Sequence, residues 1–201
     1  MILVVAEQRD GRLNRVSWES IVGAQQVAQR TGDRVVVAAI GADVQQAALE
    51  LAAAAVAEVV TVSHAALAAY TADGYTAALE QALAGLAPSL VVLPHTYQTR
   101  DFAPKLAARL DRALVTDVTA IKHEGGRTVC VRPMFQGKLV ADVVPQGPAP
   151  HLVTFRAGAY RPDMVVRGEA PAPVRALAVA VDGAAIRQKP EVPFQIGRAH
   201  V

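Results

Sequence analysis

Short apolar runs alternate with segments of helical spacing along residues 1–110, and this alternation constrains the fold more than any other feature. The runs favour buried strands, because they lack the polar alternation of a half-exposed strand. They cover residues 2–6, 34–40, 59–62 and 90–93. The intervening segments favour helices over residues 17–30, 44–57, 75–86 and 102–110. Strands that alternate with helices predict a parallel sheet with right-handed crossovers and a helical layer on each face.

After Leu114 the segments between successive β-rich runs become too short to contain helices. Four β-rich runs follow, separated by turns that contain glycine, at residues 115–122, 128–133, 139–144 and 151–155. Such spacing predicts antiparallel hairpins or a meander attached to the parallel core. We therefore expect an α/β fold of three layers, with a mostly parallel sheet and an added β-rich section.

Proline becomes frequent after Arg156, and only residues 174–181 have the composition of a further strand. We expect one α/β domain over residues 1–190 and, over residues 191–201, a linker to another domain. The last six residues, 196–201, match the translation of a common sequencing adapter. We therefore expect the reading frame to be interrupted near Gln195.

The composition excludes several classes of protein. A hydrophobic content of 52% suffices for a packed core, and a net charge of +2 gives no basis for binding nucleic acid or an anionic membrane. No apolar run reaches the roughly 18 residues of a membrane span, and the first run ends at Glu7 without a basic segment before it. A single cysteine, Cys130, excludes an internal disulfide. We expect a cytoplasmic protein.

The sequence contains no clear catalytic motif. The connection after the first strand, residues 7–13, has one glycine, whereas a dinucleotide-binding turn needs several, and no phosphate-binding loop ends in Lys-Ser or Lys-Thr. No serine has the context of a hydrolase nucleophile, and no histidine pair has metal-ligand spacing. His95 stands apart from the other histidines because it opens a loop at the end of a predicted strand.

The helix predicted after that loop has two distinct faces. Phe102, Leu106 and Leu110 recur every fourth residue and predict a buried stripe. Pro104 fits the first turn of a helix that begins near Asp101. A basic stripe of Lys105, Arg109 and Arg112 follows a similar spacing. It is either a solvated face or a contact for a partner or a phosphate.

Several segments together resemble the alpha subunit of electron transfer flavoproteins. They are Thr99-Arg-Asp-Phe-Ala-Pro-Lys-Leu-Ala-Ala-Arg-Leu110, Leu114-Val-Thr-Asp-Val118, Arg132-Pro-Met-Phe-Gln-Gly-Lys-Leu139 and Val153-Thr-Phe-Arg156. Val4-Val-Ala-Glu7 followed by Gly11-Arg-Leu13 also fits. Lys138 replaces the usual asparagine of the third segment. The similarity covers residues 1–190 in register.

The resemblance implies an electron carrier with no catalysis of its own. Members of that family are heterodimers of alpha and beta subunits, and their alpha N-terminal domain has a fold like that of adenine nucleotide alpha hydrolases. FAD is held mainly by a separate C-terminal domain of the alpha subunit, which this sequence lacks. The expected partners are the beta subunit and flavin dehydrogenases, such as the acyl-CoA dehydrogenases of fatty acid β-oxidation. We expect FAD in the complete complex and none retained by this chain.

Four charged residues are candidates for contact with a partner or with the flavin domain. Arg100 and Asp101 follow the predicted strand end, where open α/β sheets bind ligands; a local ion pair with a helix cap is the alternative. Arg132 and Arg156 suit planar contacts with anions, and the alternative is a surface charge at the end of a strand. No catalytic, cofactor-binding or metal-binding residue is predicted.

Two other functions remain open at this stage. The chain could be a separate module that binds AMP or ATP at the sheet edge, because the beta subunit, a relative in fold, binds AMP. The missing phosphate-binding glycines argue against this alternative. A small hydrolase on the same fold is a third possibility, but it lacks a nucleophile paired with a base.

Overall fold

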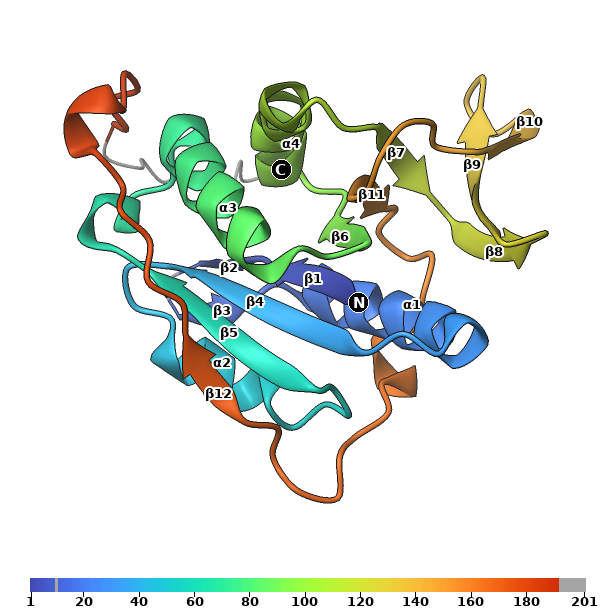
Figure 1. Cartoon of the computed structure of the whole chain (residues 1–201), viewed down its shortest axis with the longest axis horizontal. Coiled ribbons are helices and arrows are strands. Elements are labelled where there is room, and N and C mark those ends of the chain that lie inside the picture. Colours follow the sequence, from blue (N-terminus) through green and yellow to red (C-terminus); the bar gives the residue numbers. More distant parts are fainter. Residues whose placement is uncertain (10, 192–201) are drawn as a thin grey trace, which may run out of the picture.

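The computed structural model describes residues 1–9 and 11–191, and within them one large parallel sheet organises the chain (Figure 1). The sheet has seven strands in the order β12-β5-β4-β1-β6-β11-β7. They are β1 (Ile2–Ala6), β4 (Val35–Gly41), β5 (Glu58–Ser63), β6 (Leu90–Pro94), β7 (Leu114–Val118), β11 (His151–Phe155) and β12 (Val174–Ala176). Every pairing within it is parallel, as predicted from the continuous apolar runs.

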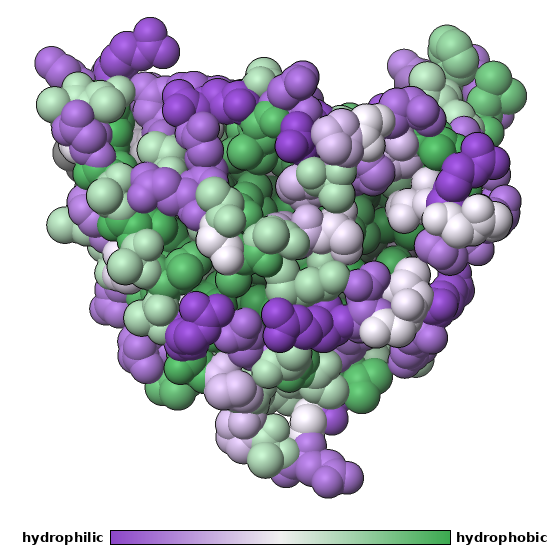
Figure 2. All heavy atoms as spheres, in the orientation of Figure 1, coloured by the Kyte–Doolittle hydropathy of each residue, from purple (hydrophilic) through white to green (hydrophobic). Residues whose placement is uncertain are grey.

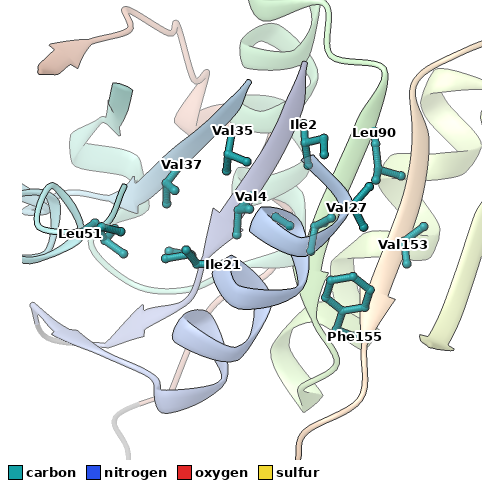
Figure 3. Close-up of a cluster of buried hydrophobic side chains, with 14 of the residues drawn as sticks. Ile2, Val4, Ile21, Val27, Val35, Val37, Leu51, Leu90, Val153 and Phe155 are labelled. Atoms are coloured by element: carbon teal, nitrogen blue, oxygen red, sulfur yellow. The ribbon is translucent and has the colours of Figure 1, made fainter. Parts of the chain in front are cut away.

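Helices cover both faces of this sheet, which confirms the three-layer α/β fold. On one face α1 (Arg15–Thr31) and α2 (Gln45–Leu51) pack against alternate strand residues such as Val4 and Val37. On the other face α3 (Ala72–Leu86) and α4 (Tyr97–Leu110) pack against the strand residues that alternate with those of the first face. Figure 3 shows the first of these cores, with Ile21 and Val27 of α1 directed at the strands.

Two small antiparallel sheets complete the fold. One contains β8 (Ala120–Glu124), β9 (Arg127–Met134) and β10 (Leu139–Val143) in the order β10-β9-β8, and it projects beside β7 in Figure 1. The other is the hairpin of β2 (Gln8–Arg9) and β3 (Arg12–Leu13), directly after β1. Short 3-10 helices lie at Ala65–Leu67, Pro162–Met164 and Gly183–Ala185.

The expected β-rich section is present but smaller than predicted. Residues 115–118 and the whole run 151–155 belong to the parallel sheet, where β11 lies between β6 and β7. A parallel pair needs a long crossover connection. Here the three antiparallel strands and the loop after β10 provide that crossover, so the absence of a helix between β7 and β11 did not indicate antiparallel pairing.

Three predicted element bounds differ in the structure. The helix expected over 44–57 stops at Leu51, because the backbone of residues 52–55 bonds to the C-terminal segment, as in Ala172 N–H to Ala52 O at 2.8 Å. The strand expected over 174–181 ends at Ala176. The helix expected over 102–110 begins earlier, at Tyr97, so Pro104 lies in its interior and not in its first turn. The predicted linker beyond Glu191 lies outside the described residues.

Candidate functional site

The carboxyl ends of β1, β6, β11 and β7 meet at one edge of the sheet because these strands are parallel. Three of the residues that follow them are charged or titratable, namely Glu7, His95 and Arg156. His95 stays next to the end of β11, since its backbone N–H donates to Phe155 O at 2.7 Å. This edge is the place where open α/β sheets bind ligands and partners.

His95 is held between two side chains of this edge. Its Nδ1 lies 2.8 Å from Thr154 Oγ1, and its Nε2 lies 4.0 Å from Asp117 Oδ1. Thr154 is 1% exposed, so its hydroxyl is part of the packed interior. The same hydroxyl accepts a 3.0 Å hydrogen bond from the backbone N–H of Asp117. Thr154 therefore fixes both the imidazole ring and the backbone of Asp117.

Asp117 interrupts β7 in a left-handed conformation, with φ of 63°. Non-glycine residues rarely adopt this region, although aspartate and asparagine tolerate it better than most. Its carboxylate accepts two hydrogen bonds of 2.8 Å from Arg156, one from Nε and one from a terminal nitrogen. Bidentate pairs of this geometry are among the stronger charge-assisted contacts.

The charges around His95 favour its neutral form. Burial is the largest cause that lowers the pKa of His95 below 6.5, and the positive charges of Arg100, Arg156 and Arg132 act in the same direction, whereas Asp117 opposes them. The hydrogen bonds from Arg156 are the main reason that the pKa of Asp117 lies below its usual value. At neutral pH the cluster therefore contains one carboxylate among several guanidinium groups.

Arg132 approaches this cluster from the antiparallel sheet. The preceding residue, Val131, accepts a 2.8 Å hydrogen bond from the backbone N–H of Thr119, which places β9 beside the end of β7. Within the described part of the chain, the buried Nε of Arg132 has no hydrogen-bond partner. Its positive charge acts on both His95 and Asp117.

The structure separates Arg100 from Asp101 instead of pairing them. The Arg100 guanidinium lies over the ring of Tyr97, 5.6 Å from its centroid, on the His95 side of α4. Asp101 accepts a 2.8 Å hydrogen bond from the hydroxyl of Tyr70. The helix cap is neither of them but Thr96, whose hydroxyl accepts from the Thr99 N–H at 3.2 Å. The local ion pair considered from the sequence is therefore absent from the described residues.

Of the four predicted contact residues, three thus gather near His95, and Asp101 does not. Sequence reasoning missed Asp117 and Thr154 as members of the group. Asp117 could have been suspected, because it is a charged residue inside an apolar strand run. Thr154 carries no such signal, since threonine is a common strand residue.

The first crossover of the sheet offers no phosphate cradle. Glu7 follows β1, and its carboxylate accepts hydrogen bonds from Asn14 Nδ2 at 2.7 Å and from the Thr96 hydroxyl. A carboxylate thus lies where the order of the strands reverses, the position that a phosphate occupies in nucleotide-binding sheets of this type. This arrangement disfavours an anionic ligand between β1 and β6.

The cluster also lacks the geometry of a hydrolase. His95 contacts the hydroxyl of Thr154, but burial keeps that hydroxyl from any substrate. The Asp117 carboxylate, which would orient a catalytic histidine, is instead held by Arg156 and lies 4.0 Å from the ring. Nucleophilic catalysis requires an accessible nucleophile next to its base.

The basic stripe of α4 forms contacts within the chain. Lys105 pairs with Asp73, and Arg109 pairs with Glu80 at 2.7 Å. Arg112 donates to backbone carbonyls, including that of Ala149 at 2.8 Å. The first two contacts connect α4 to α3, and Arg112, just beyond the end of α4, binds the loop before β11, so the stripe is not simply a solvated face.

Residues 1–9 and 11–191 contain neither a metal site nor a membrane-spanning helix. No cluster of three or more histidine, cysteine, aspartate or glutamate side chains could hold a metal ion. None of the helices there combines the length and the apolar character needed to cross a bilayer.

Comparison with known proteins identifies one family. The Electron transfer flavoprotein domain matches residues 2–182. The electron transfer flavoprotein subunit alpha of Bacillus subtilis is 34% identical over 148 residues, which cover 73% of this chain and 45% of that protein. Its counterpart in Clostridium acetobutylicum is 29% identical over 161 residues, covering 79% of this chain and 48% of that protein.

A further relative is the acryloyl-CoA reductase electron transfer subunit beta of Anaerotignum propionicum, 26% identical over 184 residues that cover 80% of this chain and 50% of that protein. The chain spans about half the length of the curated relatives it matches. The family match extends over the whole parallel sheet, from β1 to β12. The chain belongs to the electron transfer flavoprotein domain family.

Proposed function

We propose that this chain is the N-terminal scaffold domain of the alpha subunit of a heterodimeric, FAD-containing electron carrier. In that carrier the domain, over residues 1–190, holds the flavin domain and the beta subunit in an orientation suited to electron transfer. Electrons come from flavin dehydrogenases, acyl-CoA dehydrogenases among them, and pass to an acceptor in the cytoplasm. The family match to residues 2–182 is the observation on which this proposal depends.

The surface of the small antiparallel sheet supports a role in binding a protein partner. Phe135, Leu139 and Val140 are 70%, 59% and 66% exposed, respectively, and they lie close together along the β9–β10 hairpin. Figure 2 shows the corresponding apolar patch at the upper right, where Figure 1 places β9 and β10. Exposed apolar groups gathered on one projecting element are typical of interaction sites. We propose that the beta subunit binds at this hairpin.

The cofactor belongs, in this proposal, to the part of the alpha subunit that the chain does not include. The chain itself performs no catalysis and retains no FAD. This view is supported by the edge of the sheet, where Glu7 takes the place of a phosphate cradle. The comparisons give no support to the alternative of a separate module for AMP or ATP, because the relatives are named as electron transfer subunits.

The proposal is tested by co-expressing the chain with the beta subunit encoded in the same genome. Size-exclusion chromatography with light scattering should give a complex of one copy of each. Purified with excess FAD, the chain alone should carry no stoichiometric flavin absorbance, and calorimetric titration with AMP should give no binding. Flavin bound in a one-to-one ratio, tight AMP binding or failure to associate would each contradict the proposal.

A matched pair of variants tests the assigned surface. Val140→Asp should weaken association with the beta subunit, because it places a charge in an apolar contact. Leu49→Asp is the control, since Leu49 is similarly exposed at 55% but lies on α2, far from the hairpin in Figure 1. Equal effects of the two variants would exclude the hairpin as the contact.

The gene itself provides an independent check. The DNA beyond codon 195 should encode a flavin domain, and a reading frame for the beta subunit should lie next to it. A natural stop at this point with no such neighbour would contradict the assignment as an alpha subunit.

A further inference from the structure

Two arginines beside His95 have no carboxylate partner in the described part of the chain. Arg156 is not one of them, because it donates hydrogen bonds to both carboxylate oxygens of Asp117. The Arg100 guanidinium lies over the Tyr97 ring and forms no ion pair or side-chain hydrogen bond within the described residues, and Arg132 has a buried Nε without a partner. Because the Nε of Arg132 is shielded from water, leaving it unpaired costs free energy unless a ligand or a partner supplies an acceptor, whereas Arg100 is exposed to solvent.

Backbone hydrogen bonds anchor both arginines in elements whose charges reach His95. Arg100 lies in the first turn of α4, where its N–H donates to Thr96 O at 3.0 Å. Arg132 follows Val131 on β9, which is hydrogen-bonded to Thr119 just after β7. The amino end of α4 already has the carboxylate of Glu7 bound to the hydroxyl of its cap, Thr96, so the positive charge of this surface comes from the guanidinium groups. The group as a whole favours an oxyanion.

Exposed aromatic side chains flank the charges. Tyr97 is 88% exposed beneath the Arg100 guanidinium, and Phe135 is 70% exposed three residues after Arg132. Arginine together with aromatic residues is enriched in the contact regions of protein interfaces. A free phosphate would bind the guanidinium groups but would leave both rings in water.

From this arrangement we propose that Arg100, Arg132 and His95 form an oxyanion-binding surface for the carboxylates of an acidic segment on a protein partner. The inference rests on the proposed function in that the partner is another part of the electron carrier. The Asp117–Arg156 pair and Thr154 position this surface by fixing the imidazole ring and the end of β7. Docking places one or more carboxylates against the two unpaired guanidinium groups.

The test uses the isolated chain and needs no beta subunit, so it can fail separately from the proposed function. A tetraglutamate peptide, blocked at both ends, is titrated into isotopically labelled chain and followed by NMR. We expect saturable shifts of the Nε–H signals of Arg100 and Arg132. The pKa of His95 should rise in the presence of the peptide, because an added anion stabilises the imidazolium.

Variants identify the arginines responsible. Arg100→Gln combined with Arg132→Gln should weaken peptide binding by at least about tenfold, because two charge-assisted contacts are lost. Arg127→Gln is the matched control at the opposite, exposed end of β9. Arg100→Gln alone, at an exposed helix position, remains informative if the double variant does not fold. Equal weakening by the control would overturn the proposal.

Parallel titrations with inorganic phosphate and AMP separate the two sources of an oxyanion. Weaker binding of both than of the peptide supports a carboxylate-bearing protein segment. Tighter binding of either at the same arginines would assign the site to a phosphate ligand and overturn the proposal. The absence of any shift with peptide, phosphate and AMP would overturn it as well.

Discussion

Asp117 and Arg156 form a bidentate ion pair across two neighbouring parallel strands, with both hydrogen bonds at 2.8 Å. The two residues are 39 positions apart in sequence. The pair connects the left-handed turn at Asp117 in β7 to the residue that follows β11. It is the fixed element against which His95 and the unpaired arginines are arranged.

Two substitutions of Asp117 distinguish how much its charge and its backbone conformation each contribute to stability. Asp117→Asn keeps a residue that tolerates positive φ but removes the ion pair, which we expect to cost about 1 kcal/mol because Arg156 is 44% exposed. Asp117→Ala should cost roughly 1 kcal/mol more, since alanine is disfavoured in the left-handed region. Urea denaturation of the three proteins measures both differences. Equal stability of the two variants would show that the backbone there is not strained.

The low pKa of His95 predicts a loss of stability in mild acid. The unfolded histidine has the higher pKa, near 6.5, so the unfolded chain binds the proton more readily than the folded chain. The contribution of His95 to the free energy of unfolding is therefore fully present above about pH 6.5. It decreases as the pH falls below that value, by up to about 1.4 kcal/mol per pH unit. His95→Gln should flatten the difference in unfolding free energy between pH 8 and pH 5.5. An unchanged slope in this variant would contradict the assignment.

Gly23 lets α1 pack closely against the aromatic side chains beneath it. A Cβ atom there would lie 2.5 Å from Phe155 Cε2 and 2.8 Å from Tyr160 Cε2. We expect Gly23→Ala to destabilise the fold by about 1–3 kcal/mol, despite the helix propensity of alanine. Gly85→Ala is the control, because the added Cβ atom would lie 4.0 Å from its nearest neighbour, Leu177 Cδ1. Thermal denaturation should show this control to be neutral or more stable by up to about 1 kcal/mol.

Cys130 should be unreactive in the folded protein. It is fully buried, and burial raises the pKa of its thiol to about 11, whereas thiolate is the reactive form. The rate of reaction with a disulfide reagent at pH 8 should increase by about a hundredfold or more when guanidinium chloride unfolds the chain. Fast labelling under native conditions would show that the β8–β9 region opens locally.

The parallel core could be predicted because its strands are short and wholly apolar. Val35–Gly41 and Leu90–Pro94 are buried at every position, so neither strand needs a polar face. Gly32 ends α1 in a left-handed conformation with φ of 74°, which glycine adopts more readily than other residues. Helix propensity was less reliable for α2, where the C-terminal segment competes for the backbone groups of residues 52–55.

The candidate site could be predicted in part. Arg100, Arg132 and Arg156 were candidates because they are charged residues near predicted strand ends, and His95 stood apart from the other histidines because it opens a loop after a predicted strand. Their convergence depends on β11 lying between β6 and β7, which the local spacing did not indicate. Asp101 shares the same sequence neighbourhood, yet the helical turn directs it to Tyr70 and away from the cluster.

By itself, the sequence determined the alternation of strands and helices, the resemblance to one family and the absence of phosphate-binding glycines, because these depend on residues close together in the chain. Only the tertiary structure decided where His151–Phe155 pairs and that Asp117 meets Arg156. The physical reason is that an apolar strand buried on both faces can pair with any neighbour of similar character. Its place in the sheet is then fixed by the crossover and by side-chain contacts between residues that are distant in sequence.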